Sequence, residues 1–165
     1  MEQEATGDSH GLAGHGGQVG IPPVGHAVAL LGGLFLHLRV RRLRLFRRRR
    51  TGWAAGAALI GAGVLVMRWS FNAMSRAGEN PDPHIASSGV VSDGPFGFSR
   101  NPIYLGLSLV EVGVACVMNV LWPVLLLPGA LLFLDRVVVP REERYLDEEL
   151  GEPYRAYRGR VRRWL

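Results

Sequence analysis

The chain has 165 residues, of which 48% are hydrophobic, and its formal charge of +5 includes nineteen basic side chains that are all arginine. This hydrophobic content is high for a soluble protein, and the length suits one domain. The arginines alternate with long apolar runs, so the basic charge indicates contact with membrane lipids and argues against nucleic-acid binding. The single cysteine, Cys116, excludes a disulfide framework and a thiolate metal site.

The first twenty residues are rich in glycine and polar side chains, and they cannot bury enough apolar surface to become ordered. We expect a disordered tail over residues 1–20 and one domain over residues 21–165. The tail lacks the basic start and apolar core of a signal peptide. Its histidines, His10 and His15, lie in a Gly-rich context that is too weak to predict a metal site.

Three apolar stretches predict membrane helices. Residues 22–38 and 53–67 contain no Asp, Glu, Lys or Arg, and flanking side chains can extend both runs at the interface. Residues 102–134 contain one charged residue, Glu111. A straight helix of that length would reach about 50 Å, beyond a bilayer core of about 30 Å, so the chain must turn back. Asn119 and Pro123 mark the turn.

The predicted fold class is therefore an all-α integral membrane protein with about four transmembrane helices. A C-terminal helical cap on the cytoplasmic side is expected over residues 140–165. A soluble helical bundle is the alternative, but so short a chain could not cover four such helices with polar surface. Small residues in the second helix predict close approach of a neighbouring helix, at Gly52, Gly56, Ala57, Gly61 and Gly63. The four helices are expected at about 22–38, 53–71, 103–118 and 121–138.

A turn-rich stretch joins the second and third expected helices. Residues 78–102 contain repeated Gly and Asp and several prolines, and irregular backbone beside a membrane survives only when it is packed in protein or lines a wet cavity. Pro102 suits the first turn of a helix, where free N–H groups beside Arg100 and Asn101 would form an anion site. Taken alone, these residues could simply cap a helix at the interface.

A second polar motif follows the fourth expected helix. Pro140 is expected to open a short helix with Glu142 and Glu143 in its first turn, and Gly151 and Pro153 to end it. Helix capping alone would explain the two glutamates. The basic end of the chain indicates a surface helix at anionic head groups, formed by the arginines of residues 155–163 with Tyr154, Tyr157 and Trp164.

The two motifs, Arg100-Asn101-Pro102-Ile103-Tyr104 and Glu142-Glu143, are separated by a folded-back helical hairpin. Together they resemble the isoprenylcysteine carboxyl methyltransferase family and the related phospholipid methyltransferases, over the chain from about Asn80 to Leu165. The resemblance implies a membrane methyltransferase domain that uses S-adenosylmethionine, with a cofactor loop at 78–102. The cofactor-binding residues that it implies are Ser88, Gly89, Val90, Val91, Phe96, Arg100, Asn101, Pro102, Ile103, Tyr104 and Glu142, with Glu143 and Gly106 in support.

Asn101 departs from the family, which usually has histidine at this position. Asparagine keeps its hydrogen bonds but cannot titrate, so proton transfer is not expected there. An amine acceptor must lose a proton before it is methylated, whereas a carboxylate needs no base. We expect methyl transfer to a lipophilic acceptor, with carboxylate O-methylation favoured. The alternatives are N-methylation of a phosphatidylethanolamine-type lipid and a non-catalytic membrane scaffold that has kept the fold.

Tyr104 and Glu111 are the predicted catalytic residues. Tyr104, Ser108 and Glu111 share one helical face, and an ionisable group inside a span usually faces the bundle or a cavity. A structural pair with Arg136, or a bond from protonated Glu111 to a neighbour, explains Glu111 equally well. Arg136 is the predicted substrate-binding residue, which could bind an acidic head group or simply reach the interface. The reaction requires no metal.

The expected location is the cell inner membrane, crossed several times, with the active site facing the cytoplasm where the donor is made. Eight arginines between residues 39 and 50 would then lie outside, against the positive-inside rule. Either the rule is broken here, or one of the first two helices does not cross.

Overall fold

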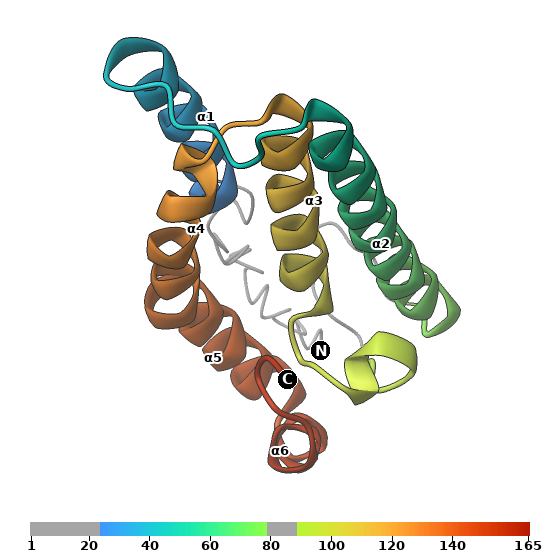
Figure 1. The fold of residues 1–165 in the computed structure, drawn as a ribbon. Coiled ribbons are helices and arrows are strands. Elements are labelled where there is room, and N and C mark those ends of the chain that lie inside the picture. Colours follow the sequence, from blue (N-terminus) through green and yellow to red (C-terminus); the bar gives the residue numbers. More distant parts are fainter. Residues whose placement is uncertain (1–23, 79–88) are drawn as a thin grey trace, which may run out of the picture.

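The computed structural model describes residues 24–78 and 89–165, and these residues form only helices and loops. Helix α2 packs along α3, and α1 packs along α4 (Figure 1). The all-α prediction is thereby confirmed for the described residues, and the tail over residues 1–20 lies outside them. In chain order the elements are α1 (Val24–Arg39), α2 (Arg49–Arg76), the 3-10 helix η1 (Gly94–Gly97), α3 (Pro102–Met118), α4 (Trp122–Phe133), the π-helical turn η2 (Leu134–Val138), α5 (Val139–Leu150) and α6 (Glu152–Arg160).

Two of the helices are long and apolar enough to cross a membrane. They are α2, with 28 residues, and the continuous helix Trp122–Leu150, with 29 residues. Only 17% of the most apolar stretch of α2 is buried, so most of its apolar surface faces outward, as lipid contact requires. Helices α1 and α3 are also apolar but have 16 and 17 residues, fewer than the roughly 20 that a full span needs. Helices thus occupy all four predicted ranges, and two of them meet the length criterion.

Glycines bring α2 and α3 into close contact. A Cβ on Gly56 would lie 2.6 Å from the carbonyl oxygen of Gly113, and a Cβ on Gly63 would lie 2.5 Å from that of Gly106. Larger side chains at these positions would push the helices apart. The predicted close approach is confirmed at Gly56 and Gly63, but Gly61 has no neighbour within 4 Å and takes no part. Gly106, expected to support the cofactor site, instead packs against α2.

Residue Asn119 makes the turn between α3 and α4, as predicted. Its backbone is left-handed, with φ at 56°, a conformation that asparagine tolerates better than most residues. Its side chain accepts a hydrogen bond from the Phe46 amide at 2.8 Å and donates one to the Phe46 carbonyl at 3.1 Å. The Leu121 amide also donates to the Leu43 carbonyl at 3.1 Å. The loop between α1 and α2 is therefore fixed to this turn at one end of the bundle.

Pro140 and Glu142 lie in the first turn of α5, as predicted, but this helix is not separate from α4. Helices α4 and α5 run without a break through η2, where the Val139 amide donates to the carbonyl of Leu134, five residues back. Proline lacks the N–H that a regular helix needs, and a π turn is one way for a helix to pass such a residue. The helix ends at Gly151, as predicted, where φ is 61°. This continuity carries the acidic part of α5 directly below the apolar part of α4 (Figure 1).

Candidate functional site

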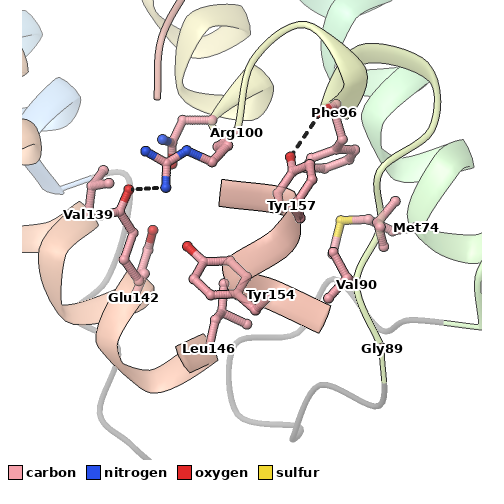
Figure 2. A pocket seen from close by; sticks show the side chains of 13 residues that line it. Met74, Gly89, Val90, Phe96, Arg100, Val139, Glu142, Leu146, Tyr154 and Tyr157 are labelled. Atoms are coloured by element: carbon pink, nitrogen blue, oxygen red, sulfur yellow. Dashed lines mark hydrogen bonds and ion pairs between the residues drawn. The ribbon is translucent and has the colours of Figure 1, made fainter. Parts of the chain in front are cut away.

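A cavity of about 160 Å³ lies where α5, α6 and the loop before α3 meet (Figure 2). Its lining combines most of the cofactor residues that the resemblance implies: Gly89, Val90, Val91, Phe96, Arg100, Asn101, Glu142 and Glu143. The sequence analysis missed the other lining residues, which are Met74, Val139, Leu146, Tyr154 and Tyr157. The two motifs, about forty residues apart in the chain, therefore form facing walls of one cavity.

Four of the implied cofactor residues are not part of this lining: Ser88, Pro102, Ile103 and Tyr104. Ser88 lies outside the described residues. Pro102 is the first residue of α3, as predicted, and lines a separate apolar cavity beside α2. Ile103 follows it in the same helical turn and lines neither cavity. These positions shape the start of α3, which in turn places Tyr104.

Among the described residues, no basic side chain lies beside the carboxylate of Glu142 to compensate its negative charge. Glu142 projects from α5 into the cavity (Figure 2). Its hydrogen bond comes from the hydroxyl of buried Tyr104, at 2.5 Å. No described arginine or histidine lies within ion-pair distance of Glu142. A partly buried carboxylate whose partner is a neutral hydroxyl is suited to accept a cationic ligand.

Glu143, by contrast, is compensated by two arginines. Arg100 Nη1 lies 2.9 Å from Oε1 of Glu143, and both side chains are 12% exposed. Arg163 donates to both oxygens of the same carboxylate, from Nε at 3.0 Å and from Nη2 at 2.7 Å. These hydrogen bonds to Glu143 are the main reason why the pKa of Arg163 is raised. Glu143 thus anchors Arg100, whose buried Nε has no hydrogen-bond partner among the described residues.

Tyr154 and Tyr157 of α6 form the floor of the cavity. Both are almost fully buried, and the hydroxyl of Tyr157 donates to the carbonyl of Phe96 at 2.9 Å (Figure 2). Burial raises the pKa of Tyr157 to about 12, so its hydroxyl stays protonated at neutral pH. These two side chains therefore face inward, while the location of α6 at anionic head groups stays a prediction. Their three-residue spacing, which puts both on one face of a helix, was the signal for an inward-facing side.

Glu111, a predicted catalytic residue, lies away from this cavity. Its Oε2 is 2.8 Å from Nδ1 of His26 in α1, and both side chains are buried. Seven residues separate it from Tyr104 along α3, an axial rise of about 10 Å. The placement matches the alternative of a bond to a neighbour, and the neighbour is His26 instead of Arg136. The Arg136 side chain is 74% exposed and pairs with the adjacent Asp135 at 3.4 Å.

The cavity therefore offers a free carboxylate, a guanidinium with a free N–H, and aromatic walls. This set of groups suits a small molecule that carries both positive and negative charge, because each charge finds an opposite partner. The described residues contain no group of three His, Cys, Asp or Glu side chains that could hold a metal ion.

The family model for phospholipid methyltransferases matches residues 51–152 of this chain, which is more than half of its length. The match includes α3, α4, α5 and all but the first two residues of α2, and both polar motifs lie within it. No curated protein and no solved structure matches the chain. The resemblance based on the two motifs is confirmed at the level of the family: the chain belongs to the phospholipid methyltransferase family.

Proposed function

We propose that this protein transfers a methyl group from S-adenosylmethionine to a lipophilic acceptor at the membrane surface. The observation that carries the proposal is that one wall of the cavity presents an acidic side chain and the facing wall presents a basic one. Glu142 has no cationic partner among the described residues, and it faces Arg100, whose Nε is free. Membership of a methyltransferase family supplies the reaction, and these two side chains supply a reason for the donor to bind here.

The charges of the donor fit these groups. S-adenosylmethionine carries a sulfonium, an ammonium and a carboxylate. Glu142 would pair with the ammonium or accept hydrogen bonds from the ribose hydroxyls, and Arg100 and Asn101 would bind the carboxylate. Phe96, whose ring lines the cavity, would cover the adenine or the sulfonium.

The bound donor supplies an electrophilic methyl group, which moves to the acceptor as the carbon–sulfur bond breaks. The task of the protein is to hold the nucleophilic atom and the methyl carbon in line at about 3 to 3.5 Å. Tyr104 contributes by fixing the carboxylate of Glu142 through its hydroxyl hydrogen bond. A catalytic role for Glu111 stays a prediction, because its described contacts are with His26.

Carboxylate O-methylation is the favoured reaction. The described lining of the cavity contains no imidazole, and Asn101 occupies the position where the related families usually carry histidine. A carboxylate acceptor needs no base, so this lining is sufficient for it. N-methylation of a phosphatidylethanolamine-type lipid is the second candidate, and the description of the matching family favours it. A scaffold that kept the fold but lost catalysis would bind no donor.

The proposed location is the cell inner membrane, crossed several times, with the cavity facing the cytoplasm. The apolar outer surfaces of α2 and of the helix Trp122–Leu150 support insertion. Arg136, exposed on η2, would meet the acidic head group of an acceptor that enters from the bilayer.

Transfer from a methyl-labelled donor tests the proposal. Membranes containing the protein should incorporate label into lipid-soluble material, and the Glu142→Gln variant should not. Glu148→Gln is the matched control, because Glu148 lies exposed on the same helix. Treatment with base then separates the two candidates, since methyl esters release the label and N-methyl lipids retain it. Failure of the wild-type protein to label any lipid would contradict both.

A further inference from the structure

Arg163 connects the two walls of the cavity. Its side chain reaches α5, where it donates to both carboxylate oxygens of Glu143 at 3.0 and 2.7 Å. Its backbone carbonyl reaches the opposite wall and accepts hydrogen bonds from Oγ of Ser99 at 3.2 Å and from Nδ2 of Asn101 at 3.0 Å. One residue thereby joins the loop before α3 to the helix that carries the two glutamates.

The same guanidinium also bridges the π turn. Its Nη1 lies 3.1 Å from Oδ1 of Asp135 in η2, and Nε1 of Trp164 donates to that oxygen at 2.9 Å. The planar fork of arginine can serve two carboxylates at once, whereas the compact ammonium of lysine cannot match this geometry. The arrangement holds Asp135 and Glu143 at a fixed separation across the irregular part of the helix, and so fixes the direction in which α5 leaves it.

The neighbouring Arg162 lacks these side-chain contacts. Its side chain is exposed, and its Nη1 donates a hydrogen bond to the carbonyl oxygen of Leu165 at 3.5 Å. The backbone carbonyl of Arg162 accepts a hydrogen bond from the Arg100 amide at 3.0 Å, a contact that does not depend on the arginine side chain. Arg162 is therefore a control of the same charge at the adjacent position.

We propose that Arg163 is a positioning residue for the donor site. By holding Glu143 from one side while Arg100 holds it from the other, Arg163 fixes the guanidinium of Arg100 and leaves Glu142 as the free carboxylate of the cavity. This inference rests on the proposed function. It extends the site beyond residues 51–152, the region that the family model matches.

Hydrogen exchange tests the connection without any donor. In detergent, the amides of residues 99–101 should exchange about tenfold faster in Arg163→Ala than in the wild type, because the segment that covers them loses its anchor. The same amides should exchange at the wild-type rate in Arg162→Ala. Equal protection in Arg163→Ala and the wild type would overturn the proposal.

Donor-site binding tests the consequence. With S-adenosylhomocysteine as the probe, Arg163→Ala should raise Kd about tenfold, because hydrogen bonds between charged groups are lost, and Glu143→Gln should raise it by a similar factor. The variant that combines both changes should have a Kd no higher than the larger of the two single-variant values, since Arg163 acts through Glu143. Losses that multiply to about a hundredfold would show independent actions and contradict the proposal.

Arg163→Lys keeps the charge but loses the fork, so its Kd should rise about threefold. It replaces Arg163→Ala in both experiments if the alanine variant does not fold, and binding at the wild-type level would then overturn the proposal. The two experiments also separate the two proposals. A wild-type protein that binds no S-adenosylhomocysteine contradicts the methyltransferase function, while hydrogen exchange still decides whether Arg163 holds the loop.

Discussion

The two ends of the helical bundle differ in whether their arginines are paired with acidic side chains. At the end formed by the α1–α2 loop and the α3–α4 turn, eight arginines lie between residues 39 and 50, and none pairs with a described carboxylate. At the cavity end, Arg100, Arg155 and Arg163 are each paired with an acidic side chain. The α1–α2 loop and α6 lie at opposite ends of the bundle (Figure 1), so arginines without a described acidic partner and arginines paired with carboxylates are separated along its length.

The two ends also differ in the contacts that fix the backbone of their loops. At the loop end, the side-chain amide of Asn119 binds both polar groups of the Phe46 backbone, so the loop is fixed without its arginines. At the cavity end, the guanidinium groups themselves join α5 to the loop before α3. Substitution of Arg100 or Arg163 should therefore damage function, whereas substitution of an arginine at the loop end should change only lipid contact.

The largest effect is expected for Arg100→Ala. This change removes one partner of Glu143 and the guanidinium that faces the donor, and truncation of a buried charge pair costs about 2–5 kcal/mol. Methyl transfer should fall at least thirtyfold, as measured with labelled donor. Arg144→Ala, an exposed change on α5, is the control and should retain wild-type activity. A variant at Arg100 that transfers methyl groups normally would break the distinction between the two ends.

Asn119→Ala should damage the loop end and spare the cavity. It removes two hydrogen bonds to Phe46 and forces alanine into a left-handed conformation, at a combined cost of about 2 kcal/mol in the free energy of unfolding. Asn119→Gly relieves the strain and should recover about half of that loss. Thermal unfolding in detergent measures both variants. The Kd for S-adenosylhomocysteine should stay at the wild-type value, and a weakened Kd would show that the two ends are coupled.

Tyr104→Phe should have a moderate effect confined to the cavity. The hydroxyl that donates to Glu142 is lost while the buried ring remains, and a hydrogen bond to a charged group contributes about 1.5 kcal/mol or more. Methyl transfer should fall about tenfold with little change in thermal stability, a ratio that corresponds to about 1.4 kcal/mol. If kcat and KM both remain at wild-type values, Tyr104 does not position Glu142.

The smallest effect on activity is expected when Arg47, Arg48, Arg49 and Arg50 are all replaced by glutamine. In membranes of neutral lipids the variant should keep wild-type transfer, because the start of α2 lies at the opposite end of the bundle from α5 and α6 (Figure 1). Anionic lipids should stabilise the wild type more than the variant, since each arginine near such a surface contributes about 1 kcal/mol. Thermal unfolding in vesicles with and without anionic lipid measures this difference.

The apolar runs of the sequence were sufficient to predict the helices and the reversal at Asn119, because lipid-facing and buried positions share the same composition. They marked the apolar part of each helix and not its ends. Helix α2 begins at Arg49 and ends at Arg76, because arginine is a good helix former that does not stop a helix. The passage through Pro140 was not predicted, since a proline after an apolar run also fits a helix start, and only the π turn resolves the choice.

Local patterns in the sequence also decided which residues of the site were predicted. The motifs at Arg100 and Glu142 are local patterns, and the family resemblance predicted that they lie close together in the fold. No local pattern marks His26 or Arg163. Their partners, Glu111 and Glu143, lie 85 and 20 residues away in the sequence and are brought close by the packing of helices. Arg163 also lies among arginines that resemble one another in the sequence, so its side-chain contacts with Glu143 and Asp135 are what distinguish it from Arg162.

Binding of S-adenosylhomocysteine by the purified protein in detergent, measured by calorimetry, tests the central claim most directly. The proposed donor site predicts saturable binding for the wild type and for Glu148→Gln, and its loss in Glu142→Gln, whose side chain keeps its size but carries no charge. Absence of saturable binding by the wild type, or unchanged binding by Glu142→Gln, would contradict the assignment of this cavity as the donor site.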